Sequence, residues 1–383
     1  MSIAVVVNAY DRPRSLARLL SGLRECEAPA GTEVVISVDG GGSSRDEVLA
    51  VANGFDWHGR SVKVIEQDDL GLVGHFRRCG DMVDELGPIV MLEDDLVVGP
   101  TALRFAEAAL DFTASDNRVA GVCLSTPWFD GFRHQRFEPL LDGSAAVYLK
   151  IPWFHGMAWT PEQWHRHRVG ANVDATVELP PAFGDLGLDE WFPDATRALI
   201  AQDNWYLAAR QARAVNFGDA GTHFSEATAS FQQPLIQGSF RAPVLLDLDD
   251  PDVVPYDEYL EPDGRWLARR VKALAELDVT FDLRGIRSPQ SITTEWVVTS
   301  RPSPKPVSQW GAAMVPLEQN LISEVPGKAL TLCRTADMST GKSADRWAEL
   351  TVLRHAHRGR PPGIRGALRR RTIEMRSGRT GER

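Results

Sequence analysis

The chain has few features of a membrane or secreted protein. Among its 383 residues, no apolar run approaches the roughly 20 residues that a transmembrane helix needs, and no basic region precedes the first apolar stretch. Its four cysteines are scattered without metal-ligand spacing, which indicates buried thiols rather than disulfides or a zinc site. We therefore expect a cytoplasmic protein.

Signatures of the common nucleotide-binding loops are also missing. There is no GxxxxGKS/T phosphate loop, and the glycines at 40–42 do not complete a GxGxxG dinucleotide fingerprint. The formal net charge of −10 argues against a general nucleic-acid binder. The charge is uneven, because residues 354–383 are strongly basic and are interrupted by Gly and Pro. We expect this tail to be disordered, with a peripheral contact at the inner membrane surface as the alternative.

Apolar runs of strand length alternate with amphipathic stretches of helical spacing over the first hundred residues. The expected strands lie within 2–9, 32–38, 61–66 and 88–93, and the expected helices within 15–26, 43–55 and 71–86. Ser15 is the expected N-cap of the first helix. This alternation, with strands that are apolar throughout, indicates an α/β fold with a mostly parallel sheet and helices on both faces. We expect it to span 1–240, with a C-terminal appendage of unclear fold over 241–353.

Polar side chains stand where the expected strands end, namely Asn8, Asp39 and the acidic triplet at 93–95. Open α/β sheets bind ligands beyond the carboxyl ends of their strands. Desolvating a carboxylate is costly unless a cation or strong donors meet it, and the triplet directly follows a buried strand. The triplet therefore predicts a Mg²⁺ or Mn²⁺ ion held through one carboxylate while it bridges phosphate oxygens. A solvated turn between two strands is the alternative.

The later segments of the chain are less regular. Residues 151–167 are rich in Trp and His and lead into a helix expected at Pro161. A further helix is expected to begin near Asp203, and a strand over 213–217 is followed by a loop of small polar residues. Such a loop has the composition of a mobile segment that closes over a ligand.

Five segments, taken in order, resemble GT-A-fold nucleotide-sugar glycosyltransferases of family 2, with a motif order closest to that of N-acetylglucosaminyltransferase I. The segments are VVVNAYDRPRSLARLLSGL, VISVDGG, GHFRRCGDMVDEL with VMLEDDLVV, PWFHGMAWTPEQW, and DNWYLAARQARAVNFGDAGTHFSE. The resemblance covers residues 1–235. It implies a metal-dependent, inverting transfer of a sugar from a nucleotide-diphosphate sugar, a UDP-sugar above all. The acceptor would be a hydroxyl of a carbohydrate or glycoconjugate, as in polysaccharide biosynthesis.

The resemblance implies roles for the residues on the nucleotide side. Asn8, Tyr10 and Arg12 would line the nucleotide pocket, and Asp39 would accept a hydrogen bond from the uracil or the ribose. The competing role for Asp39 is that of a turn residue before Gly40.

The resemblance also assigns the phosphate side. Glu93 and Asp94 would contact the ribose and the sugar, and Asp95 would bind Mn²⁺ or Mg²⁺. Arg78 would approach the donor phosphates, although Arg77 is an equivalent choice and both are compatible with solvent-facing helix positions.

The catalytic base is where the sequence departs from the family pattern. An inverting transferase needs a carboxylate to deprotonate the acceptor hydroxyl. The Asp-Asp-Trp sequence of N-acetylglucosaminyltransferase I corresponds here to Asp203-Asn204-Trp205, and the amide of Asn204 cannot take the proton. We expect Asp203 to be the base, at the start of its helix, where the helix dipole would lower its pKa. Asp189 and Glu190 are the alternatives, and a plain N-cap role for Asp203 is the competing explanation.

Three further residues, His223, Trp153 and Trp159, each have a functional and a structural interpretation. His223 would contact a phosphate or the metal, or be an ordinary loop residue. Trp153 and Trp159, with the backbone at Gly156, would form a wall for sugar stacking, or be core tryptophans.

Two other classes of protein fit the pattern less well. A nucleotidyltransferase on a related sheet would carry glycines and basic residues in the loop after the first strand, which has no glycine here. A non-catalytic nucleotide- or carbohydrate-binding protein that has lost its base is the second alternative, because of Asn204.

Overall fold

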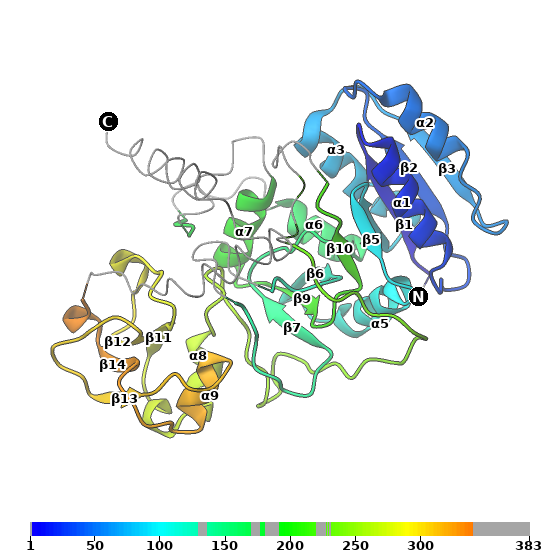
Figure 1. Cartoon of the computed structure of the whole chain (residues 1–383). Helices are drawn as coiled ribbons and strands as arrows, with labels where there is room; N and C mark the ends of the chain where they lie inside the picture. The colour runs from blue at the N-terminus through cyan, green and yellow to red at the C-terminus, as the bar shows by residue number, and fades with distance from the viewer. Residues whose placement is uncertain are drawn as a thin grey trace, which may run out of the picture.

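An eight-stranded sheet occupies the centre of the computed structural model, which describes residues 2–128, 136–169, 177–180, 191–219, 227, 229 and 231–339 (Figure 1). Its strands, in spatial order, are β3 (Val62–Glu66), β2 (Val34–Val38), β1 (Ala4–Ala9), β4 (Ile89–Glu93), β8 (Met157–Trp159), β6 (Val119–Cys123), β9 (Trp205–Ala209) and β7 (Ala146–Leu149). β8 and β7 run antiparallel to their neighbours, and the other adjacent pairs are parallel. The four strands expected in the first hundred residues form one parallel block.

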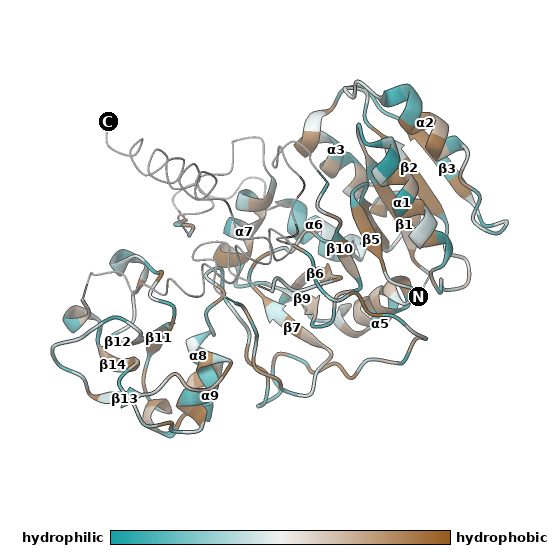
Figure 2. Cartoon of the chain, viewed as in Figure 1, coloured by the Kyte–Doolittle hydropathy of each residue, from teal (hydrophilic) through white to brown (hydrophobic). Residues whose placement is uncertain are grey.

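Helices cover both faces of this sheet. α1 (Pro13–Arg24), α2 (Arg45–Asn53) and α5 (Ala102–Thr113) pack on one face, and α3 (Gly71–Gly80), α6 (Pro161–Val169) and α7 (Trp191–Gln202) pack on the other. Side chains alternate along a strand, so Val5 and Val7 of β1 join the first group while Val6 joins the second. Figure 2 shows the central strands as hydrophobic along their length. The predicted mostly parallel α/β fold is confirmed.

Two helix boundaries differ from the prediction. The helix expected over 71–86 is two helices, α3 and α4 (Val83–Leu86). The break follows Gly80, where an added Cβ would lie 2.0 Å from the Trp164 ring, and Trp164 Nε1 donates to Asp81 Oδ1 over 3.0 Å. α1 begins at Pro13, a favoured first helical residue, so Ser15 lies inside the helix and is not its N-cap.

The prediction that a helix begins near Asp203 is wrong, because a helix ends there. α7 terminates at Gln202, Asp203 takes a left-handed φ of 52°, and Trp205 starts the buried strand β9. Leu and Ala within 205–209 favour helix on propensity, but the segment is inserted between β6 and β7 and is fully buried. Tertiary packing overrides the local preference.

Two smaller sheets complete the described chain. β5 (Leu96–Val98) and β10 (Ala214–Asn216) form an antiparallel ribbon beside the large sheet. In the appended region, β11 (Val279–Asp282), β12 (Trp296–Thr299), β14 (Leu330–Arg334) and β13 (Ser308–Trp310) form a four-stranded sheet with α8 (Gly264–Leu267) and α9 (Leu317–Ile322) nearby. One hydrophobic core runs from the large sheet into this region through Leu149 and Tyr256.

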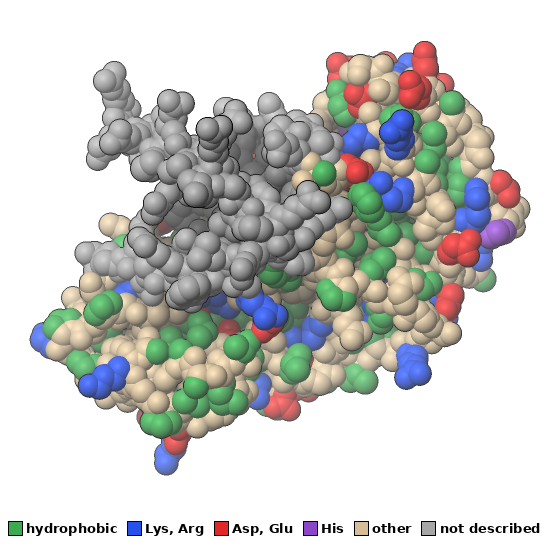
Figure 3. All heavy atoms as spheres, viewed as in Figure 1, with side chains coloured by type: hydrophobic (Ala, Val, Ile, Leu, Met, Phe, Trp, Pro, Cys, Tyr) green, Lys and Arg blue, Asp and Glu red, His purple; other side chains and the backbone are tan. Residues whose placement is uncertain are grey.

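The described surface carries charges of both signs. In Figure 3 acidic and basic side chains are interspersed over the face in view. None of the helices in the described ranges has the length and apolar character that crossing a membrane requires. The basic tail lies outside the described residues.

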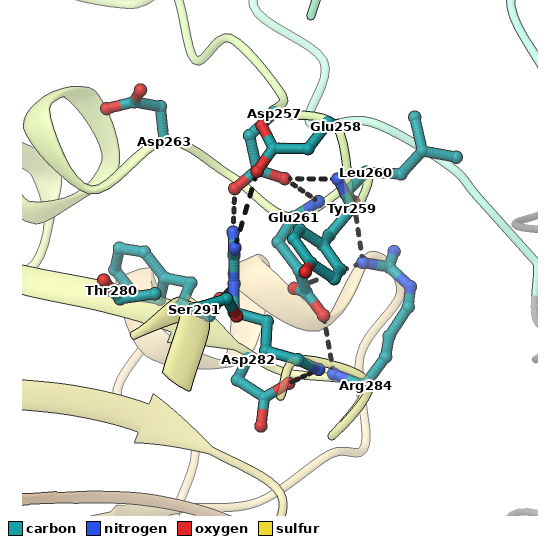
Figure 4. Close-up of polar contacts among 12 residues, drawn as sticks. Asp257, Glu258, Tyr259, Leu260, Glu261, Asp263, Thr280, Asp282, Arg284 and Ser291 are labelled. Carbon is teal, nitrogen blue, oxygen red and sulfur yellow. Dashed lines mark hydrogen bonds and ion pairs between the residues drawn. The ribbon is translucent and has the colours of Figure 1, made fainter. Parts of the chain in front are cut away.

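A buried ionic network fixes the loop at 257–263 to the turn that follows β11 of the appended sheet (Figure 4). Arg284 N donates to Glu261 Oε1 over 2.8 Å, and the Arg284 guanidinium lies 3.4 Å from Glu261 Oε2. Arg287 pairs with Asp257 and donates its backbone N–H to Asp282 Oδ1 over 2.9 Å. Burial raises the pKa of Glu261 to about 8, against the attraction of Arg284. The network therefore holds a carboxyl group that resists ionisation.

We predict that Glu261 makes the free energy of unfolding fall as the pH rises from about 5 to about 8. Its pKa rises from 4.5 to about 8 on folding, so between these values the folded state holds a proton that the unfolded chain has lost, and a rising pH favours the unfolded chain. Above pH 8 both states have lost the proton and the dependence levels off. Urea unfolding should give Glu261→Gln a flatter pH dependence than the wild type over this range. The exposed Glu47→Gln on α2 should keep the wild-type slope. Parallel curves for wild type and Glu261→Gln would contradict the prediction.

Candidate functional site

The carboxyl ends of β2, β1 and β4 lie side by side. Asn8 is in register with Ser37 of β2 and with Glu93 of β4. Backbone hydrogen bonds continue past the strands, from Asp39 N to Ala9 O over 3.0 Å and from Asp94 N to Asn8 O over 3.1 Å. The sheet therefore gathers the polar residues of the three strand ends at one edge.

Two adjacent carboxylates are buried at the end of β4. The side chains of Asp94 and Asp95 are 2% and 11% exposed. Arg12 reaches both, with Nη2 2.6 Å from Asp94 Oδ1 and Nη1 donating to Asp95 Oδ2 over 2.7 Å. Burial raises the pKa of Asp94 to about 6, although Arg12 acts in the opposite direction. The guanidinium thus offsets part of the cost of burying two like charges.

The two oxygens of Asp95 have different surroundings. Oδ2 accepts from Arg12 and also from Asn216 Nδ2, over 2.9 Å. The carbonyl of Asp95 accepts from Phe217 N over 3.0 Å. Oδ1 is buried without a hydrogen-bond partner in the described part of the chain. The ribbon of β5 and β10 therefore orients Asp95 with one carboxylate oxygen left over.

The residues around the acidic pair are tied to backbone. Tyr10 N donates to Asp94 Oδ2 over 3.0 Å, and the Tyr10 hydroxyl donates to Gly41 O over 3.2 Å. Asp39 Oδ1 accepts from Gly40 N over 2.8 Å and from Leu70 N over 2.9 Å. Asp39 therefore holds the turn after β2, which was its competing role, while Tyr10 remains 43% exposed above the strand ends.

Arg78 is not brought to the acidic pair. It is exposed in the last turn of α3, whose first turn adjoins Asp39 through Leu70. Eight residues at 1.5 Å per residue separate Arg78 from Leu70 by about 12 Å along the helix. Arg77 is half-buried beside Trp191 and Asp194. The expected contact of Arg78 or Arg77 with donor phosphates stays a prediction.

Asp203 lies at the opposite edge of the sheet from the acidic pair. Trp205, two residues on, is in register with Val119 at the start of β6, and β6 runs in the same direction as β4. Asp203 Oδ1 accepts from Lys150 Nζ over 2.6 Å, and Asp203 Oδ2 accepts from Arg265 Nη1 over 2.5 Å. Burial acts to raise its pKa, but the bonds from Arg265 and Lys150 lower it to about 2. The lowering comes from these cations and not from a helix start.

Whereas Asp203 follows the last residue of α7, the first residues of this helix lie near the strand edge that carries the acids. Phe192 packs edge-on against Phe154, with 5.9 Å between ring centroids. Gly156, two residues beyond Phe154, would place a Cβ 3.2 Å from Leu92 Cδ2 of β4. Asp189 and Glu190 directly precede α7 in the sequence and lie outside the described residues, as does His223.

The two tryptophans have different roles. Trp159 is fully buried at the level of Ile89, and its Nε1 donates to Tyr206 OH over 2.8 Å, so it is a core residue. Trp153 lies at the edge near the acids, and its Nε1 has no hydrogen-bond partner in the described chain. The imidazole of His155 beside it is also without one, and burial lowers its pKa to about 3.

Sequence reasoning missed Asn216. The residue follows an apolar run that pairs with β5, but its partner Asp95 is 121 positions earlier, so only the three-dimensional pairing reveals the contact.

The acidic pair suits a divalent ion that takes most of its ligands from bound phosphates and water. Within the described ranges, no group of three or more His, Cys, Asp or Glu side chains is arranged to enclose a metal. Mg²⁺ and Mn²⁺ sites at diphosphates, however, commonly use one or two carboxylates and take the remaining ligands from the phosphates and water. Asp95 Oδ1, which has no hydrogen-bond partner in the part of the chain that the structure describes, is a carboxylate oxygen of that kind.

Comparison with known proteins finds no matching family model and no matching curated sequence. Among solved structures, S. aureus TarS 1-349 matches over 56% of this chain and 60% of its own, at 16% identity and a TM-score of 0.37. The same TarS fragment is also known in complex with UDP-GlcNAc. Mannosyltransferase PcManGT from Pyrobaculum calidifontis, in complex with GDP-Man and Mn²⁺, matches over 55% of this chain and 54% of its own, at 16% identity and a TM-score of 0.35. This chain thus spans less than two thirds of either structure.

We predict that Asp203→Asn lowers the free energy of unfolding by about 1–3 kcal/mol, because the buried ammonium of Lys150 loses its carboxylate partner. Urea unfolding measures the change. Asp194→Asn removes a carboxylate from an i,i+3 pair with Arg197 on α7 and serves as the control, with an expected loss of about 0.5 kcal/mol or less. Equal losses in the two variants would contradict a structural role for Asp203.

Proposed function

We propose that this protein is a glycosyltransferase that uses a nucleotide-diphosphate sugar, a UDP-sugar above all, together with Mn²⁺ or Mg²⁺. The observation that carries the proposal is the buried pair of Asp94 and Asp95 at the carboxyl ends of parallel strands, with Asp95 Oδ1 unpartnered among the described residues. An ion bound at Asp95 would supply Lewis-acid stabilisation of the departing diphosphate. The acceptor is a hydroxyl of a carbohydrate or glycoconjugate.

Different residues of this chain bind the nucleotide and the sugar parts of the donor. Asn8, Tyr10 and Asp39 stand on the nucleotide side of the edge, and Glu93 and Asp94 stand toward the ribose and sugar. Tyr10 is 43% exposed there, so its ring is available to contact a base. Support for the donor comes from this arrangement and from the ordered set of motifs in the sequence.

The base belongs on the side of the acidic pair, because inverting transfer requires it at the acceptor hydroxyl as the sugar moves. Asp203 is at the far edge and is held by two cations. The family resemblance assigns the base to an acid at the start of a helix, and that helix is α7, which begins at Trp191. We therefore propose Asp189 or Glu190 as the base.

A test of the donor uses thermal unfolding with a panel of nucleotides. UDP or a UDP-sugar with Mn²⁺ should raise the melting temperature, because a ligand that binds the folded state stabilises it. Asp95→Asn should abolish the Mn²⁺-dependent part of the shift while leaving the melting temperature of the free protein measurable. A parallel assay of released products separates the alternatives, since pyrophosphate release from a nucleoside triphosphate would indicate a nucleotidyltransferase, and binding without turnover would indicate a binding protein. A shift that persists undiminished in Asp95→Asn would remove the metal ligand from the proposal.

A second test concerns the base. Asp189→Asn or Glu190→Gln should reduce sugar transfer by about two to four orders of magnitude, the usual contribution of a general base. UDP binding in the same variant should stay near wild type, because the base contacts the acceptor. Asp203→Asn is the matched control and should retain transfer at a temperature where it is folded. Loss of transfer in Asp203→Asn alone would return the assignment to Asp203.

A further inference from the structure

Arg12 takes the place that a metal cation needs. Its two terminal nitrogens lie 2.6 Å from Asp94 Oδ1 and 2.7 Å from Asp95 Oδ2, so one guanidinium bridges both acids. Among the described ion pairs, these are the ones that reach the two carboxylates. An ion approaching Asp95 Oδ1 would meet a like charge already seated against the same carboxylate group.

The two acids are held in place independently of Arg12. Tyr10 N donates to Asp94 Oδ2, and Asn216 Nδ2 donates to Asp95 Oδ2. Each carboxylate therefore keeps a neutral donor if the guanidinium leaves. The Arg12 side chain is 31% exposed, whereas those of the acids are 2% and 11% exposed, so the arginine is the member of the cluster with access to solvent.

We propose that Arg12 is an exchangeable counter-cation. It neutralises the acidic pair when the site is empty, gives up the carboxylates to the divalent ion that arrives with the donor, and then binds the donor diphosphate with the freed guanidinium. This inference rests on the proposed function. It predicts that the ion alone binds weakly, because it must displace Arg12. The ion and the nucleotide should then strengthen each other's binding, because the diphosphate gives Arg12 a new partner.

The test is a Mn²⁺ titration of the full-length protein, with free Mn²⁺ followed by electron paramagnetic resonance, without nucleotide and then with saturating UDP. Arg12→Gln should bind Mn²⁺ alone about tenfold more tightly than wild type and should bind UDP in the presence of Mn²⁺ about tenfold or more weakly. The two effects have opposite signs. A merely structural role for Arg12 would weaken both.

Arg14→Gln is the matched control, since it removes the same charge two residues away from an exposed position on α1. It should change each constant by less than about twofold, because a solvated charge is largely screened. If Arg12→Gln fails to fold, Arg12→Lys replaces it. A lysine keeps the charge but cannot bridge two carboxylates with a planar fork, so ion binding should tighten by a smaller factor.

The outcomes separate this inference from the proposed function. Unchanged or weaker Mn²⁺ binding in Arg12→Gln without nucleotide would overturn the exchange, even if wild type binds UDP with Mn²⁺. Tighter Mn²⁺ binding in the variant, together with a wild type that binds no nucleotide, would support the competition for the acids and reject the donor.

Discussion

Two neighbouring carboxylates buried at the end of one strand impose the main constraint on this molecule. Both side chains of Asp94 and Asp95 are removed from water, and an isolated buried charge costs several kcal/mol. The fold meets this cost from segments far apart in sequence. The turn after β1 supplies Tyr10 and Arg12, more than 80 residues earlier, and β10 supplies Asn216, 121 residues later than Asp95. The strand order brings Tyr10 and Arg12 to the two acids, since β1 lies directly beside β4.

The reversed strand β8 divides the large sheet into two functional parts. The block from β3 to β4 carries the acidic pair at its carboxyl edge. Beyond β8, the direction of β6 and β9 is again that of β4, so α7 starts near the same edge and delivers Asp203 to the opposite one. The interactions of Asp203 with Lys150 and Arg265 belong to the junction between β7, α7 and α8, which explains why the pKa of this acid, far from the acidic pair, is lowered.

The parallel block could be predicted from the sequence because its signals are local. The apolar strands and the acids at the end of β4 follow from neighbouring residues, although α1 begins at Pro13 and not after Ser15 as expected. The helix expected to begin near Asp203 was wrong for the opposite reason, since Leu and Ala in 205–209 favour a helix until the neighbours β6 and β7 are known. The position of Arg78 relative to the strand ends could not be predicted, because it depends on the direction in which α3 leaves them. Asn216 needed the β5–β10 pairing, and the appended sheet mixes parallel and antiparallel pairs that no periodicity indicated.

The contact between Gly80 and Trp164 makes these two positions interdependent. No side chain fits at 80 while the indole occupies its present place, and a smaller residue at 164 would leave a void beside the rings of Phe76 and Trp159. Substitution of either position alone is therefore penalised, whereas a paired exchange of volume is allowed. Related sequences should show the two positions changing together, a glycine at one matched by a large ring at the other. Such a correlation would identify relatives that share the packing of α3 on α6 even where the acids at β4 have diverged.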